Sequence, residues 1–185
     1  MPSPVGHSIA GLIAYQVAPE IDGLARRQVI ALYLFAANAP DLDFLPGLLV
    51  GDPNRFHHGV SHSGGLALLF AIAVSLILRR RQREWRWKPF LVLFGLYLSH
   101  LILDYLAEDH SVPYGVPLFW PVSRAYYMSP VPLFSDIDRT NATAAFFPSL
   151  FSAHNLRSVS LECLVLVPVL LLAFALMKRR RREAG

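Results

Sequence analysis

The residues best suited to chemistry in this sequence are histidines and aspartates that lie near the ends of its apolar segments. His100 and Asp104 are four positions apart in one such segment, so on a helix both side chains would share a face and could reach one atom. A metal ion is a common reason to bring an imidazole and a carboxylate together on an apolar helix. A hydrogen bond joining two helices would explain this pair equally well.

Three more histidines, His57, His58 and His62, are clustered just before another apolar segment. Ser61 is a predicted N-cap of the helix that follows, which would place His62 in its first turn. Gly59 gives the chain the freedom to fold either His57 or His58 back beside His62. The alternative is an exposed, pH-sensitive loop.

Two carboxylates, Asp41 and Asp43, follow Pro40 at the end of a third apolar segment. An extended chain would point them in opposite directions, whereas a turn after the proline would let them converge. Helix capping and solvated charge are the alternative. With His7 at the start of the first apolar segment, the candidate metal ligands are His7, Asp41, Asp43, His57, His62, His100 and Asp104.

This ligand set contains nitrogen and oxygen but no thiolate, because the single cysteine, Cys163, lies within an apolar run. One cysteine excludes a disulfide framework and a cysteine-rich zinc module. Imidazoles and carboxylates suit Zn²⁺, our first choice, or Mn²⁺ or Fe²⁺. Such an ion with an open position lowers the pKa of its water toward about 7. The sequence contains no Gly-x-Ser-x-Gly motif for a serine nucleophile.

The elements that must position these residues are strongly apolar: 54% of the side chains are hydrophobic and only 16% are charged. Val159–Met177 could form a helix of about 28 Å, close to the thickness of a bilayer core. Residues 61–78 and Pro89–Leu106 are further candidate spans, and Ser8–Ala18 with Gly23–Ala37 would form a shorter hairpin. A soluble bundle is disfavoured because these segments are apolar on nearly every face. The sequence predicts an all-α integral membrane bundle of about four to five embedded helices, forming one domain over residues 1–185.

Two basic blocks predict how this bundle is oriented. Arg79–Lys88 and Lys178–Arg182 stand directly at the ends of apolar runs, as expected of cytoplasmic flanks. Residues 178–185 would then be a cytoplasmic tail, and the aromatic, proline-rich residues 105–158 an outer-face segment. All the candidate ligands fall on that outer side. No groove-reading motif accompanies the basic blocks, so a lipid bilayer is the expected partner and nucleic acid is not.

The order of these motifs resembles the YdjM-like family, bacterial inner-membrane proteins described as metal-dependent hydrolases, some of them as LexA-binding. The resemblance rests on His7, Pro40–Asp43, His57–Ser63, Ser99–Asp104 and Gly115–Pro121, and covers about residues 1–125 together with the closing apolar helix. It implies a multi-pass protein of the bacterial cytoplasmic membrane. It assigns the ligand role to His57 and His62.

One position departs from the family pattern. The family usually reads His-Arg-Gly-x-Thr-His-Ser, and His58 stands here in place of the arginine. If that arginine binds a phosphate-like charge, its replacement leaves the substrate class open. A more distant likeness of the His-x-x-x-Asp pair to zinc-dependent phospholipase C and P1 nuclease favours phosphoester chemistry by analogy only.

The resulting expectation is a metal-dependent hydrolase that uses metal-activated water on a phosphoester or lipid-linked substrate, with Asp43 as a general base and His58 stabilising developing negative charge. The alternative is a non-catalytic membrane protein, either metal-binding or regulatory in the LexA-binding manner.

His110 and His154 could add a second metal site, although surface histidines are the simpler interpretation. Glu162 is interpreted as a carboxylate that snorkels from the last span rather than as a site residue.

Overall fold

The computed structural model describes residues 1–82 and 85–183. Residues 83–84 of the basic connector and 184–185 of the predicted tail lie outside the described residues. The described chain is helical and contains no strand, only two isolated β-bridges, Ala107–Phe134 and Val116–Tyr127. Its elements are α1 (Pro4–Val17), α2 (Arg26–Asn38), the 3₁₀ turn η1 (Ala39–Asp43), α3 (Phe44–Leu49), the 3₁₀ turn η2 (Val60–His62), α4 (Gly64–Gln82), α5 (Trp87–Tyr105), α6 (Thr143–Ser149) and α7 (Ala153–Glu183). The all-α prediction is confirmed for these residues.

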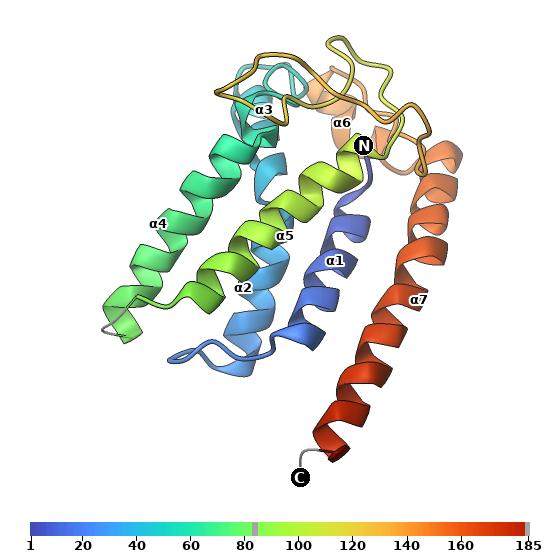
Figure 1. Ribbon diagram of the computed structural model, residues 1–185. Coiled ribbons are helices and arrows are strands. Elements are labelled where there is room, and N and C mark those ends of the chain that lie inside the picture. The colour runs from blue at the N-terminus through green and yellow to red at the C-terminus, as the bar shows by residue number, and fades with distance from the viewer. Residues whose placement is uncertain (83–84, 184–185) are drawn as a thin grey trace.

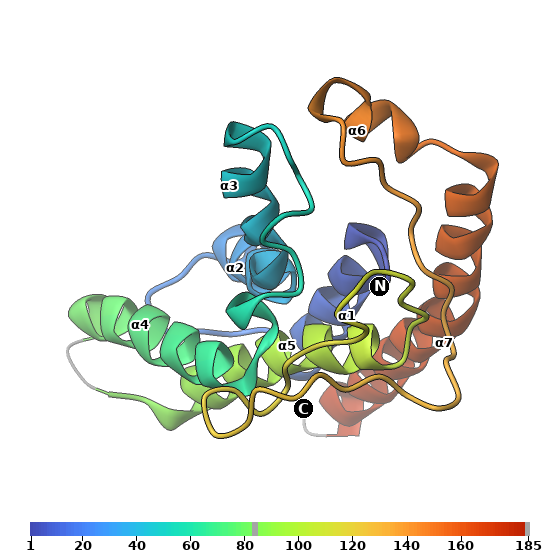
Figure 2. The same cartoon turned by 90° about the horizontal axis from the view of Figure 1, so that it is seen from above.

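The long helices run side by side, and one end of the bundle is covered by loops and two short helices (Figure 1). Helix α1 packs against α2, α5 and α7, while α4 packs mainly against α5. Seen from above, α7 lies on the outer side of α1, away from α4 (Figure 2). The covered end contains η1, α3, η2, α6 and the irregular residues 106–142. We call it the cap.

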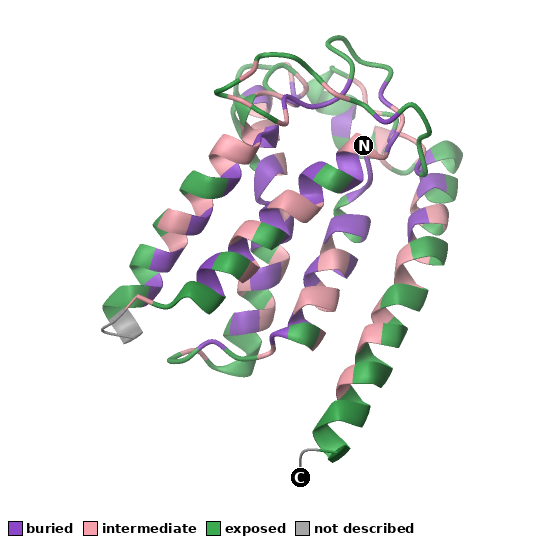
Figure 3. Cartoon of the chain, in the orientation of Figure 1, coloured by how far each residue is buried: buried purple, intermediate pink, exposed green. Residues whose placement is uncertain are grey.

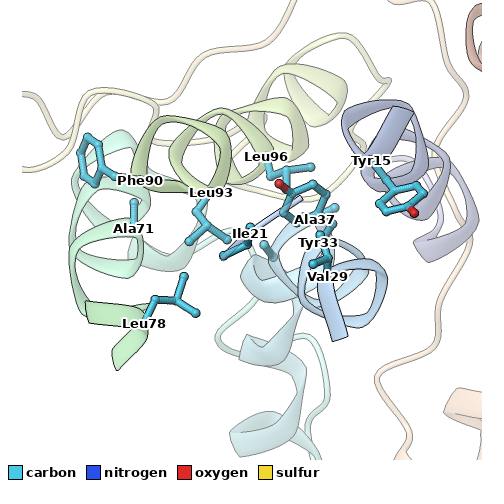
Figure 4. Close-up of a cluster of buried hydrophobic side chains, with 11 residues drawn as sticks. Tyr15, Ile21, Val29, Tyr33, Ala37, Ala71, Leu78, Phe90, Leu93 and Leu96 are labelled. Carbon is cyan, nitrogen blue, oxygen red and sulfur yellow. The ribbon is translucent and has the colours of Figure 1, made fainter. Parts of the chain in front are cut away.

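Apolar side chains from α1, α2, α4 and α5 form the main core (Figure 4). Val29 and Tyr33 of α2 pack there with Leu93 of α5, and all three are almost completely buried. The Tyr33 hydroxyl donates a hydrogen bond to the Ala18 carbonyl, which satisfies its polar end inside the core. A second cluster, which includes Tyr97 and Leu101 of α5, lies next to it toward the cap. The two clusters therefore hold the part of α5 that leads to the candidate site residues.

Two stretches are long and apolar enough to cross a membrane in the part of the chain that the structure describes: Arg26–Leu49 and Ala153–Glu183, which contain 18-residue windows of mean hydropathy 1.2 and 2.6. This is fewer than the four to five embedded helices that the sequence predicted. The main reason is charge, because α4 ends in a run of arginines and α5 includes Lys88 and its own polar pair, whereas α1, with 14 residues, is too short. By length and composition, α1, α4 and α5 do not qualify as independent spans.

Helix α7 differs from the others in its exposure (Figure 3). Beyond its first turns it presents large apolar side chains outward, and Leu171, Leu172 and Phe174 are each at least half exposed. The buried polar residues Asn155, Ser158 and Glu162 are confined to the part nearest the cap. An apolar helix this exposed needs an apolar surrounding along most of its length.

Candidate metal centre

Two histidines and two aspartates meet where α5 passes the two 3₁₀ turns beneath the cap. The Nε2 atoms of His62 and His100 are 3.3 Å apart. Asp104 Oδ2 lies 3.1 Å from His100 Nε2 and 3.4 Å from His62 Nε2, and Asp41 Oδ1 lies 3.5 Å from each of them. Both imidazoles are fully buried. The residues come from η1, η2 and α5. His100 and Asp104 point in the same direction from α5, as predicted from their spacing of four residues on one helix.

The hydrogen bonds around this group decide where its protons sit. His100 Nδ1 lies 2.8 Å from the Ala37 carbonyl, which only accepts, so this nitrogen carries the proton. His62 Nδ1 lies 3.1 Å from Asp43 Oδ2, likewise an acceptor. With a proton on each Nδ1, the two Nε2 atoms face each other and two carboxylates. Electron pairs gathered this closely, away from water, require a positive charge between them.

His7 completes this inner group from α1. Its ring stacks on that of His100 with centroids 3.6 Å apart, and its Nε2 lies 3.5 Å from Asp104 Oδ1. Neither nitrogen of His7 makes a hydrogen bond within the described residues, and the same holds for both carboxylate oxygens of Asp41 and of Asp104. Buried polar atoms are rarely left in this condition. The donor set therefore fits a divalent cation bound by nitrogen and oxygen.

Asp43 occupies a different position from its neighbour Asp41. The Ser61 hydroxyl donates to its Oδ2 over 2.6 Å, His62 Nδ1 approaches the same oxygen, and His57 Nδ1 lies 2.9 Å from its Oδ1. All of its strong contacts are thus with side chains that it orients. A carboxylate behind a metal-binding histidine fixes the ring and its tautomer. The 3₁₀ turn after Pro40 sends Asp41 and Asp43 to these two neighbouring places, which the sequence left open.

His57 and His58 point to separate partners. His57 contacts Asp43 and, through Nε2, the sulfur of Met1. With Asp41 and Asp43 it forms a second grouping whose ligand atoms could hold an ion. Neither histidine is hydrogen-bonded or ion-paired to Asp41 or Asp104 within the described chain, but the grouping that includes Asp41 contains His57 and not His58.

His58 belongs to a dyad with Asp109. Its backbone is left-handed, with φ of 58°, and its Nδ1 lies 3.1 Å from Asp109 Oδ2. Burial lowers the pKa of His58, and Asp109 partly opposes that shift. Burial alone would raise the pKa of Asp109, but the hydrogen bonds from His58 and from the Ser111 and Gly115 amides lower it to about 2. His58 is therefore neutral near pH 7, and its buried Nε2 makes no hydrogen bond within the described residues.

A profile of the YdjM inner membrane protein family matches residues 1–182. The chain belongs to the YdjM inner membrane protein family. The match extends well past the last sequence motif near residue 121 and includes α6 and α7. No curated protein and no solved structure matches the chain. The membrane association predicted from composition is thus supported by the family, whereas the hydrolase chemistry is not tested by it.

The Gly115–Pro121 motif of this YdjM family member acts as a strap over the start of α4. The Leu118 and Trp120 carbonyls accept hydrogen bonds from the Gly64 and Gly65 amides at 2.9 and 3.1 Å. A Cβ atom at Gly65 would lie only 2.6 Å from the Trp120 oxygen. The strap therefore fixes the chain directly after His62, which explains why the motif accompanies the histidines.

The predicted N-cap at Ser61 is wrong. Helix α4 begins at Gly64, and the hydroxyl that accepts an amide hydrogen bond from its first turn belongs to Ser63. Ser61 lies in η2, where its hydroxyl donates to Asp43 and its carbonyl accepts from the Tyr97 hydroxyl over 2.7 Å. Ser61 therefore orients Asp43 in the site, and the N-cap of α4 is Ser63, two residues further along the chain.

Glu162 does not snorkel, contrary to the prediction. Its side chain is fully buried and accepts hydrogen bonds from the Ser3 amide at 2.7 Å, the Gly6 amide at 3.1 Å and the Ser3 hydroxyl. A carboxylate at a helix N-terminus satisfies free amides and complements the helix dipole. Glu162 thereby ties α7 to the start of α1, only a few residues before His7.

His110 and His154 meet at the surface around Asp136. His110 Nδ1 lies 2.8 Å from Asp136 Oδ2, and His154 Nε2 lies 3.3 Å from Asp136 Oδ1. Asp136, Asp138 and His154 also form a grouping compatible with an ion. Both histidines are exposed, however, and each has a hydrogen-bond partner, so ordinary pairing accounts for the contacts.

Sequence reasoning missed Asp109, Asp136 and the role of Glu162. Asp109 and Asp136 lie in irregular chain, where no helical or strand period predicts a direction for a side chain. The only available signal was adjacency, because Asp109 stands beside His110.

Proposed function

We propose that this protein is a membrane-bound, metal-dependent hydrolase that acts on a phosphoester or lipid-linked substrate. The observation that supports this most is the buried meeting of the His62 and His100 Nε2 atoms beside Asp41 and Asp104. His7 would complete the set, and His57 with Asp43 could hold a second ion. A bound divalent ion, zinc by first choice, would supply hydroxide from water near neutral pH.

Proton transfer in this proposal falls to His58 rather than to Asp43. Asp43 already accepts from Ser61 and contacts two histidines, so it serves to orient them. His58 is neutral, is held by Asp109 through Nδ1 and has a free Nε2. It also lines a cleft of about 630 Å³ that adjoins the inner group. A neutral imidazole held in this way can accept a proton from an attacking water and return it to a leaving group.

The location is also a proposal: a multi-pass protein of the bacterial cytoplasmic membrane with its site on the extracytoplasmic side. The far ends of α4 and α7 carry the basic blocks, and both lie opposite the cap (Figure 1). Basic residues gathered at one end of a membrane bundle favour the cytoplasm for that end. The inner group then lies near the outer surface, at the depth where lipid headgroups and water are accessible.

Elemental analysis of detergent-purified protein tests the proposal, together with hydrolysis of a phosphodiester such as bis-p-nitrophenyl phosphate. We expect at least one tightly bound divalent ion per chain and activity that a chelator removes. His100→Ala with Asp104→Ala should abolish both. His110→Ala with Asp136→Ala is the matched control, since it removes the same residue types from the surface pair. A chain without stoichiometric metal, or one whose metal survives the first double substitution, contradicts the proposal.

A bound, fully coordinated ion without turnover would favour the non-catalytic alternative. The inner group supplies five candidate donors, enough to fill a tetrahedral site. Spectroscopy of the cobalt-substituted protein would separate the two functions, because a hydrolase requires an open or water-occupied position.

A further inference from the structure

Two cavities of opposite character meet beside the metal centre. The first is the polar cleft of about 630 Å³ already described, which His57, His58 and Asp109 line. The second is an apolar pocket of about 270 Å³ between the chain start, α3 and α6, lined by residues such as Phe44, Leu48, Phe146 and Leu150. Asp41, a candidate metal ligand, forms part of the apolar pocket's wall.

Arg139 borders both cavities. No carboxylate lies within 4.0 Å of its guanidinium among the described residues, and its one direct partner is the Phe44 ring, with the centroid 5.3 Å from Cζ. The side chain is half-buried. A partly desolvated guanidinium without an anion has lost hydration without recovering a charge-assisted hydrogen bond. Its planar group of donors is suited to a phosphate.

The loop that carries Arg139 is held in place from α7. The buried Asn155 side chain accepts from the Asp138 amide at 2.7 Å and donates to the Asp138 and Ser149 carbonyls at 2.9 and 3.1 Å. The Thr140 amide donates to the Ser149 hydroxyl on the other side of Arg139. The backbone on both sides of the arginine is thus fixed before any ligand arrives, which lowers the entropy lost on binding.

Two acidic residues of the polar cleft, Asp109 and Asp136, are engaged with other partners. Asp109 accepts from His58 and from two backbone amides, and Asp136 contacts His110 and His154. Arg55, the other arginine of the cleft, lies over the Phe56 ring and does not border the apolar pocket. Of the two arginines that line the cleft, Arg139 is therefore the one placed at the junction of the two cavities.

We infer that Arg139 binds the anionic head of a membrane lipid phosphoester whose apolar chain occupies the pocket between α3 and α6. The inference rests on the proposed function and names its substrate class. Leu45 and Phe147 line the pocket and are each more than half exposed, so the pocket is open to the surface through apolar side chains. A hydrocarbon chain entering there would leave its head between Arg139 and the inner group, because Asp41 belongs to the same wall.

Isothermal titration calorimetry of the detergent-purified, metal-containing protein tests this with inorganic phosphate, butyl phosphate, hexyl phosphate and hexanol. Affinity should rise with chain length by about fourfold for each methylene that becomes buried, and hexanol should bind far more weakly than hexyl phosphate. Arg139→Gln should weaken hexyl phosphate at least tenfold, as expected for the loss of a charge-assisted pair. Arg124→Gln, which removes an exposed arginine that lines neither cavity, is the matched control and should change nothing.

Two further variants keep the result interpretable. Arg139→Lys retains the charge and should bind with intermediate affinity, and Leu48→Gln should remove the dependence on chain length while leaving inorganic phosphate binding intact. Equal losses in Arg139→Gln and Arg124→Gln, or equal binding of inorganic and hexyl phosphate, would overturn the inference. Metal content is measured on the same samples. A chain that holds metal but fails these tests refutes the lipid assignment alone, whereas a chain without metal refutes the proposed hydrolase.

Discussion

The protein contains two groups of histidines and aspartates that look alike in sequence and differ in surroundings. In the inner group, His62, His100 and Asp104 are buried, and neither carboxylate oxygen of Asp104 makes a hydrogen bond within the described residues. In the surface group, His110 is exposed and pairs with Asp136 in the ordinary way. Residue type alone thus does not identify a metal site. Buried polar atoms that lie side by side without hydrogen bonds are the better sign, because a bound cation would satisfy them.

The largest difference between the two groups is expected at Asp43 and Asp136, the aspartates that contact histidines in each group. Asp43→Asn should lower metal affinity by about 10- to 100-fold, because the amide no longer holds the His57 and His62 rings and the His62 tautomer. Asp136→Asn in the surface group should leave metal affinity unchanged. Competition with a chromogenic chelator measures both.

If the two asparagine variants lost metal equally, the distinction between the groups would be wrong. Retention of full affinity by Asp43→Asn would show that the contact of Asp43 with the two rings does not matter for the ion.

A second test compares two carboxylates on α7. Glu162→Ala removes the acceptor for two amides and a hydroxyl of the buried chain start, so it should destabilise the protein by about 2–3 kcal/mol. Glu183→Ala removes an exposed pair with Arg179 and should change stability by less than about 0.5 kcal/mol. Thermal unfolding in detergent reports both values, and comparable shifts would contradict the capping role of Glu162.

The smallest effect is expected in the surface group. The hydrogen bond and charge of Asp136 raise the pKa of His110 above its ordinary value. This pairing therefore adds stability that is complete below the unfolded pKa of histidine and is lost as the pH rises through the raised folded pKa. In Asp136→Asn the imidazole should titrate at a lower pH than in the unsubstituted protein. Histidine ring signals in NMR spectra follow this directly, and an unchanged midpoint would show that the pair does not form in solution.

The sequence predicts contacts between residues that are close along one helix, but not contacts between residues that are far apart along the chain. His100 and Asp104 could be paired because a helix repeats every 3.6 residues, and positively charged ends placed the ligand-bearing segments together. Arg139 and Asp109 could not be placed, since both lie in irregular chain that is fixed by distant partners such as Asn155 and His58. Fewer stretches qualify as spans than the sequence predicted, because the arginines of α4, the polar residues of α5 and the shortness of α1 exclude these helices.

The length of helix α7 and its attachment near one end have a mechanical consequence for the bundle. Its 31 residues form a rod of about 46 Å, and the described polar contacts that hold it lie near one end, at Asn155 and Glu162. A thicker or thinner bilayer changes the tilt of such a rod. A change of tilt would then reach the Arg139 loop and the first turn of α1, so the thickness of the surrounding lipid would act on the end of the bundle that carries the candidate metal centre.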